Sequence, residues 1–144
     1  MDYYVTLDYT EQHFYLSVDD KFCNNDSDEK SERKKYKLYK KENIGMVILG
    51  KESNKNYITV ISDRRFVMIE NRTNRYQVHW KNLKLVSLKN ENLIFKTFSD
   101  KTKMIPISRL SCENKDLEDI GKWILKIIRQ KIKQNAKNNY QQVP

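Results

Sequence analysis

The side chains best suited to catalysis or metal binding are few and widely spaced in this sequence. It has two histidines, His13 and His79, and two cysteines, Cys23 and Cys112, and they do not have the spacing of metal ligands. Three glycines in 144 residues form no phosphate-binding loop, and no nucleophile motif is present. We therefore expect a protein that is not an enzyme and needs no metal or cofactor. For the cysteines, two reduced thiols are the simpler expectation, although a single disulfide is also possible.

Basic residues are the other side chains with a possible chemical role, and they are unevenly distributed. Residues 1–29 contain eight acidic residues and one lysine, a net charge of −7, whereas residues 30–144 contain 27 basic and 11 acidic residues, a net charge of +16. Together these give the chain's net charge of +9. A basic body with an acidic arm indicates an anionic partner, either a membrane surface, a nucleic acid or an acidic protein face. The arm could also fold back and compete for the basic surface, and a charged surface that only maintains solubility is the other interpretation.

Short strands separated by polar turns must position these basic residues. Apolar patterns predict strands over residues 3–9, 14–18, 35–39, 44–49, 57–61, 66–69, 76–80, 83–88, 93–98 and 104–107. A polar, mostly acidic linker covers residues 19–32, and a loop is expected over residues 50–56. Strands of this length and spacing are typical of an all-β sandwich or barrel.

The C-terminal segment has the pattern of one amphipathic helix. Its apolar residues recur at spacings of three and four, and they are Leu117, Ile120, Ile124, Ile127 and Ile128, with Trp123 and Leu125 widening the stripe. Asn114 is the candidate N-cap, and Lys131 and Lys133 lie in the expected last turn, where positive charge complements the helix dipole. Burial of the stripe should dock the helix on the sheet. Residues 135–144 are expected to form a tail.

Neither a membrane span nor a signal peptide is indicated. No apolar run approaches the roughly 18 residues that a transmembrane helix requires, and the N-terminus lacks a basic segment followed by a long apolar stretch. We therefore expect a cytoplasmic protein.

Seven strands followed by one amphipathic helix is the layout of the pleckstrin-homology superfold, and three segments resemble it locally. YITVISDRRFVMI (57–69) resembles two strands joined by a basic turn, YQVHW (76–80) the next strand, and LEDIGKWILKIIRQK (117–131) the closing helix. Together they are most similar to the C-terminal pleckstrin-homology-like domain of the chorein, or vacuolar protein sorting thirteen, family of bridge-like lipid transfer proteins. The resemblance implies a mainly β fold: a pleckstrin-homology-like, seven-stranded, bent antiparallel sandwich or barrel capped by the helix. It covers residues 34–134, preceded by N-terminal strands and an acidic linker (1–33) and followed by the tail (135–144).

The resemblance implies a non-catalytic targeting or adaptor domain. Such a domain would dock a larger lipid-transfer protein on an organelle membrane through anionic lipid, a small GTPase or both. It would be cytoplasmic, peripheral at organelle membranes and monomeric as an isolated domain. The alternative is a protein-interaction domain that binds a peptide or a GTPase without lipid. Nucleic-acid binding is not expected, because no recognised motif is present, although basic charge interleaved with Tyr36, Tyr39, Tyr57 and Tyr76 could form a stacking surface if these rings do not pack in the sheet.

Three turns of the expected sandwich carry two basic residues each and are the candidate lipid-binding site. Alternating strand directions place the first-to-second and third-to-fourth turns at one end of the sheet, and in pleckstrin-homology domains the sixth-to-seventh turn joins them there. We call the six residues the predicted basic rim: Lys51, Lys55, Arg72, Arg75, Lys101 and Lys103. Phosphoinositide-binding members carry a lysine and a basic-x-arginine pattern on the second strand, which Asn56-Tyr-Ile-Thr-Val lacks, so diffuse electrostatic binding or a protein partner is favoured. The loops offer no apolar residue for insertion, so lipid binding should be salt-sensitive.

Overall fold

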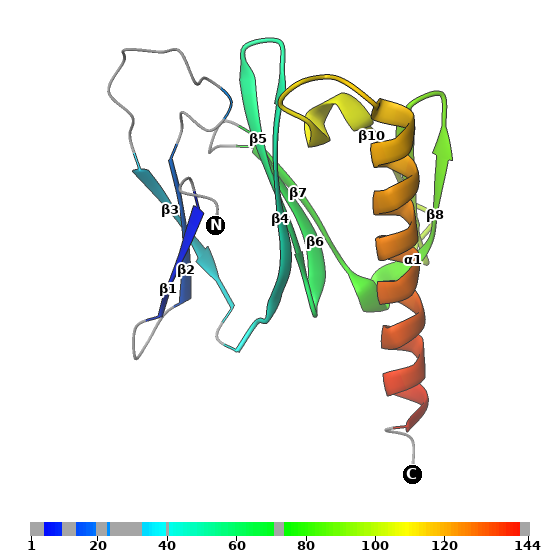
Figure 1. Ribbon diagram of the computed structural model, residues 1–144. Coiled ribbons are helices and arrows are strands. Elements are labelled where there is room, and N and C mark those ends of the chain that lie inside the picture. Colours follow the sequence, from blue (N-terminus) through cyan, green and yellow to red (C-terminus); the bar gives the residue numbers. More distant parts are fainter. Residues whose placement is uncertain are drawn as a thin grey trace. The chain divides into compact units, whose positions relative to one another are not determined.

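The computed structural model describes residues 5–9, 14–19, 23, 33–39, 41–70 and 74–141. The chain divides into two compact units, Met1–Asn43 and Ile44–Pro144, each with its own strands (Figure 1). The second unit therefore begins at Ile44, whereas the sequence led us to expect a domain over residues 34–134.

The first unit contains a three-stranded antiparallel sheet in the order β1-β2-β3. Its strands are β1 (Val5–Tyr9), β2 (Phe14–Asp19) and β3 (Arg33–Leu38). The strands predicted at 3–9, 14–18 and 35–39 are confirmed, and the third of them pairs with the second inside this unit. Most of the acidic linker lies outside the described residues. The hypothesis that the acidic arm folds back concerns these residues and stays a prediction.

The second unit begins with a four-stranded antiparallel meander in the order β4-β5-β6-β7. Its strands are β4 (Ile44–Glu52), β5 (Lys55–Ser62), β6 (Arg65–Glu70) and β7 (Asn74–His79). The β4–β5 turn occupies only Ser53 and Asn54, and Ser53 adopts a left-handed backbone with φ of 56°. The loop expected over residues 50–56 is therefore mostly strand.

A second meander of three antiparallel strands follows, in the order β10-β9-β8. Its strands are β8 (Leu83–Lys89), β9 (Asn92–Thr97) and β10 (Thr102–Pro106). The short 3-10 helix η1 (Trp80–Asn82) connects the two sheets, and a second one, η2 (Ile107–Leu110), follows β10. Every strand predicted from the apolar pattern is thus present.

Aromatic side chains from both sheets form the centre of the second unit's core. The ring of Phe66 lies 4.8 Å from that of Phe95, and the ring of Tyr76 lies 5.8 Å from that of Phe95, measured between centroids. Trp80 is also buried, and its indole N–H donates a 2.8 Å hydrogen bond to the carbonyl oxygen of Ser62. A buried indole N–H needs such a partner, so this bond fixes η1 against the end of β5.

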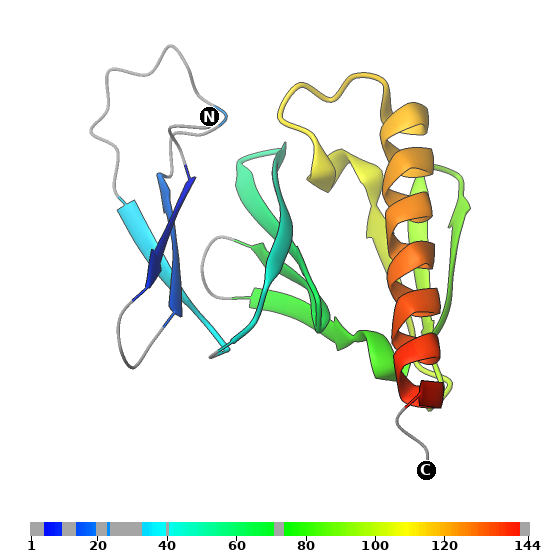
Figure 2. The same ribbon diagram turned by 60° about the horizontal axis from the view of Figure 1, so that its bottom comes forward.

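The helix α1 (Leu117–Gln141) covers the β8–β10 sheet with its apolar stripe, as predicted (Figures 1 and 2). Ile124 and Ile128 have no exposed surface, and a side chain at Gly121 would contact Leu88 and Ile107. Trp123 does not belong to the buried stripe, because 51% of its surface is exposed.

The two ends of α1 differ from the prediction. The carbonyl oxygen of Asp116, and not of the predicted cap Asn114, accepts the first intrahelical hydrogen bond, from Ile120 N–H at 3.0 Å. The helix continues to Gln141, into the segment expected as a tail, so its last turn contains no basic residue and Lys131 lies well before it. The longer helix is compatible with the sequence because residues 134–141, although mostly polar, contain no proline or glycine.

Over the described residues the fold class is mainly β with a single α-helix, at the C-terminal end, as the sequence predicts. In the described part of the chain, no helix combines the length and the apolar character needed to cross a membrane.

Candidate functional site

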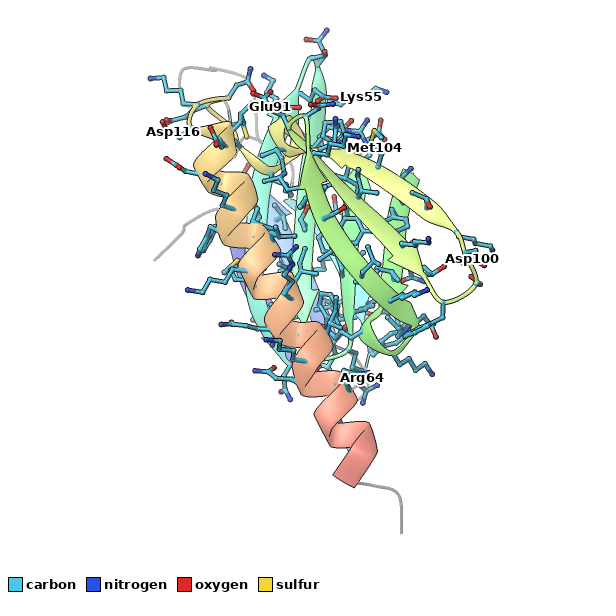
Figure 3. All side chains as sticks on the ribbon, turned by 90° about the vertical axis from the view of Figure 1, so that its right-hand side faces the viewer. Lys55, Arg64, Glu91, Asp100, Met104 and Asp116 are labelled. Atoms are coloured by element: carbon cyan, nitrogen blue, oxygen red, sulfur yellow. The ribbon has the colours of Figure 1, made fainter. Side chains whose placement is uncertain are left out.

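The second unit has two ends, which we name by a residue or element at each. The Glu70 end contains the β4–β5 turn, the end of β6 and the start of β7, because the strand register pairs Glu52 with Lys55 and Glu70 with Asn74. It also contains η2, which contacts Glu52, and the start of α1 (Figure 3). The η1 end contains η1 and the β5–β6 and β9–β10 turns. Lys55, Glu91 and Asp116 lie together at the first end and Arg64 lies at the second (Figure 3).

Lys51 and Lys55 of the predicted basic rim flank the β4–β5 turn at the Glu70 end. Arg72 lies outside the described residues. Arg75 pairs with Ile69 at the start of β7, which lies at the same end as the β4–β5 turn. The side chain of Arg75 is not described. Lys103, on β10, holds its ammonium nitrogen 5.7 Å from the centre of the Tyr76 ring.

Carboxylates neutralise part of this end, and sequence reasoning missed them. The Lys55 ammonium lies 2.9 Å from a Glu70 carboxylate oxygen, which keeps the pKa of Glu70 below and that of Lys55 above their usual values, chiefly through the hydrogen bond between them. Arg109 of η2 lies 3.3 Å from Glu52, which also accepts a hydrogen bond from Ser108. A sequence signal for Glu52 and Glu70 did exist, because each stands at the end of a strand next to a basic turn.

A small cleft of about 150 Å³ opens between these groups, and it is lined by Tyr57, Met68, Glu70, Tyr76, Lys103, Ile105 and Arg109. The Arg109 guanidinium lies over the Tyr57 ring at 4.9 Å. Burial raises the pKa of the Tyr57 and Tyr76 hydroxyls, so both stay neutral. The cleft thus combines two cations with a carboxylate, which offsets part of the positive charge that an anionic headgroup would meet.

The structure does not bring Lys101 together with Lys51 and Lys55. The β9–β10 turn is joined to η1 by a 3.0 Å hydrogen bond from Phe98 N–H to the carbonyl oxygen of Asn82. Asp100, in that turn, accordingly lies well away from Lys55 in Figure 3. The sixth-to-seventh turn therefore belongs to the η1 end.

The η1 end gathers basic residues from segments far apart in sequence. A 3.0 Å hydrogen bond from Trp80 N–H to the carbonyl oxygen of Arg64 joins the β5–β6 turn to η1, α1 packs against η1, and the ammonium nitrogen of Lys131 lies beside Gly45 at the start of β4. At this end the β5–β6 turn, η1 and the β9–β10 turn carry the basic residues Arg64, Lys81 and Lys101 and the acidic residues Asp63 and Asp100, and α1 adds Lys131. Arg64, Lys81 and Lys101 are all exposed.

Acidic residues gather instead at the Glu70 end and at the start of α1. They are Glu52, Glu70, Glu91, Glu113, Asp116, Glu118 and Asp119. From Ile120 to the end of the sequence there are six basic residues and no acidic one. The second unit is therefore polarised along α1, with its uncompensated positive charge toward the η1 end.

The expectation that no loop exposes an apolar side chain is wrong. Phe98 lies in the β9–β10 turn, just after β9 ends at Thr97, and 66% of its surface is exposed. The sequence pattern assigned Phe98 to the strand, where a side chain of that type is usually buried. Met104 on β10 is also exposed, at 56%.

Several other candidate groups have structural roles or no site geometry. Tyr57 is buried and Tyr76 packs in the aromatic core, so these two rings do not form a stacking surface.

Neither Cys23 nor Cys112 is a free thiol, contrary to the expectation of two reduced cysteines. Within the described ranges, no group of three or more His, Cys, Asp or Glu residues could hold a metal ion.

No family model, no curated protein and no solved structure matches the chain.

Proposed function

We propose that the chain is a non-catalytic binding domain that docks on an anionic membrane surface through the η1 end of its second unit. The observation that carries this proposal is the charge separation between the two ends of the unit. Each basic residue near an anionic bilayer is attracted by about 1 kcal/mol. The exposed Arg64, Lys81 and Lys101 and the lysines and arginine of α1 supply this attraction, and Asp63 and Asp100 offset part of it.

The proposed architecture is pleckstrin-homology-like. A four-stranded meander, a three-stranded meander and one C-terminal helix in the second unit agree in number and order with the strands and closing helix of that superfold. With the sequence resemblance described for residues 57–69, 76–80 and 117–131, this supports a targeting domain of a larger, chorein-like lipid-transfer protein. Such a domain acts in the cytoplasm, peripherally on an organelle membrane.

A protein-interaction domain is the second candidate, and the exposure of Trp123 favours it. Tryptophan and arginine are enriched at the energetic centres of protein interfaces, and Trp123 is half-exposed on α1 beside a face with Lys122, Lys126 and Arg129. In this case the partner, for example a small GTPase, would present an acidic surface to α1.

Vesicle flotation with two matched variants tests the membrane proposal. Arg64, Lys81 and Lys101 are replaced by alanine in one variant, and Lys51, Lys55 and Lys103 in the other, so that each loses three positive charges. We expect the first variant to lose binding to phosphatidylserine-containing vesicles and the second to retain most of it. Equal losses in the two variants would mean that net charge, and not the η1 end, drives binding. Failure of the wild type to bind these vesicles would reject membrane docking and favour the protein partner.

A further inference from the structure

Phe98 has the largest exposed fraction, 66%, among the large apolar side chains of the described residues. We infer that Phe98 is an apolar anchor that inserts into the headgroup region when the η1 end docks on an anionic membrane. This inference rests on the proposed function and adds to it a residue and a contact that do not depend on charge.

Hydrogen bonds hold the β9–β10 turn in one shape and so fix the position of Phe98. Thr97 N–H donates to the carbonyl oxygen of Lys101 at 3.0 Å, and Asp100 N–H donates to the carbonyl oxygen of Thr97 at 3.1 Å. The Thr97 and Ser99 hydroxyl oxygens lie 2.9 Å apart, and Asp100 adopts a left-handed backbone with φ of 63°. The turn is also bonded to η1 through Phe98 N–H. The backbone that carries the Phe98 ring is therefore already fixed before binding, which lowers the entropy lost on binding.

Two basic residues lie on the segments that meet at Phe98, which suits a bilayer interface. Lys101 lies in the same turn, and Lys81 lies on η1, next to the Asn82 carbonyl that the turn binds. Asp100 is the one carboxylate of the turn and Asp63 is that of the β5–β6 turn, and the basic residues Arg64, Lys81, Lys101 and Lys131 outnumber these two. Phenylalanine on an interfacial segment buries its ring at the boundary between headgroups and acyl chains, and lysines beside it reach the phosphates.

A membrane fits this surface better than a protein does. One exposed aromatic ring among charged residues is a small apolar area, whereas a stable protein interface buries about 800 Å² on each partner with an apolar centre. A bilayer needs only partial insertion of such a ring, since charge attraction and apolar insertion together give stable attachment.

The test compares Phe98→Ala with Met104→Ala, which removes a similarly exposed apolar side chain from β10. Partitioning of each variant onto phosphatidylcholine vesicles containing phosphatidylserine is measured at low and high salt. We expect Phe98→Ala to bind about tenfold more weakly than the wild type, as burial of part of a phenyl ring predicts. It should also lose the binding that the wild type retains at high salt, while Met104→Ala behaves as the wild type. Thermal unfolding of both variants checks that each is folded.

The outcomes separate this inference from the proposed function. If the wild type binds anionic vesicles and Phe98→Ala binds equally well at both salt concentrations, the anchor is rejected and electrostatic docking stands. If the wild type does not bind, both are rejected. As a second measurement, Phe98→Trp should gain emission that brominated lipids quench, in excess of the quenching of the native tryptophans, and no added quenching would also overturn the anchor.

Discussion

The backbone N–H of Phe98 donates a 3.0 Å hydrogen bond to the carbonyl oxygen of Asn82. This bond joins the β9–β10 turn to η1, and with it an exposed aromatic ring to the basic residues of the η1 end. The turn that the resemblance placed beside Lys51 and Lys55 thereby lies elsewhere. Because the turn lies at the η1 end, Lys101 is separated from the carboxylates of Glu52 and Glu70, which lie at the other end of the unit.

The close approach of β4 to η2 makes Gly50 a position that tolerates no side chain. A Cβ atom there would lie 2.0 Å from the carbonyl oxygen of Arg109, so Gly50→Ala must displace η2 or β4. We expect the free energy of unfolding to fall by about 2–3 kcal/mol, as for other overpacked sites. Urea unfolding measures this, with Gly45→Ala as the control, since its Cβ would meet the nearest backbone oxygen at 3.3 Å. Equal effects of the two substitutions would contradict the proposed clash.

The hydrogen bond between Trp80 and Ser62 should contribute measurably to stability. Trp80→Phe keeps an aromatic ring but removes the indole N–H that donates to the Ser62 carbonyl oxygen at 2.8 Å. Loss of a buried hydrogen bond costs about 1–3 kcal/mol when it leaves an acceptor without its donor. Chemical unfolding of Trp80→Phe should show this loss, while Trp123→Phe, at a half-exposed position, should change stability by less than about 0.5 kcal/mol. A neutral Trp80→Phe would contradict this role of the bond.

The strands and the helix could be predicted because their patterns are local. Alternation in Tyr76, Val78 and Trp80 and the spacing of Ile124 and Ile128 each follow from the side of an element that faces the core. Other features depend on contacts between distant segments. The unit boundary at Ile44 reflects which strands pair, and strand pairing is not encoded in the local apolar pattern.

The candidate site was predicted less well than the fold, for a similar reason. Lys51 and Lys55 were found from their turn, but their neutralisation depends on Glu70, which is brought to Lys55 by the register of β5 with β6. Phe98 follows an apolar run and was assigned to the strand, although the strand ends one residue earlier. An apolar run in the sequence does not mark the residue at which backbone pairing stops, and this difference of one residue concealed the exposed ring.

The pair of Lys55 and Glu70 predicts a pH-dependent stability difference. The hydrogen bond from Lys55 lowers the pKa of Glu70 in the folded state, so the carboxylate stabilises the fold above its unfolded pKa, and this contribution disappears as the pH falls through the folded pKa. Glu70→Gln should therefore be less stable than the wild type at neutral pH, by a small amount, since both groups are near solvent. Urea unfolding at pH 7 and at strongly acidic pH checks this, and a difference that persists at acidic pH would argue against the pair.

The helix should be stabilised by burial of its stripe and not by its polar end. Ile128 has no exposed surface, so Ile128→Ala should reduce the free energy of unfolding by about 2–5 kcal/mol. Lys133→Ala on the exposed face should be nearly neutral in the same urea titration. Similar effects of the two substitutions would show that α1 does not dock through this stripe.

Binding of the wild-type chain to vesicles of graded phosphatidylserine content tests the central claim most directly. Flotation is measured on pure phosphatidylcholine vesicles and on vesicles with increasing phosphatidylserine, at low and at high salt. Membrane docking through the η1 end predicts no binding to the neutral vesicles, binding that rises with phosphatidylserine content, and a large but incomplete loss at high salt. The same low level of flotation on every vesicle would contradict membrane docking and direct the search to an acidic protein partner.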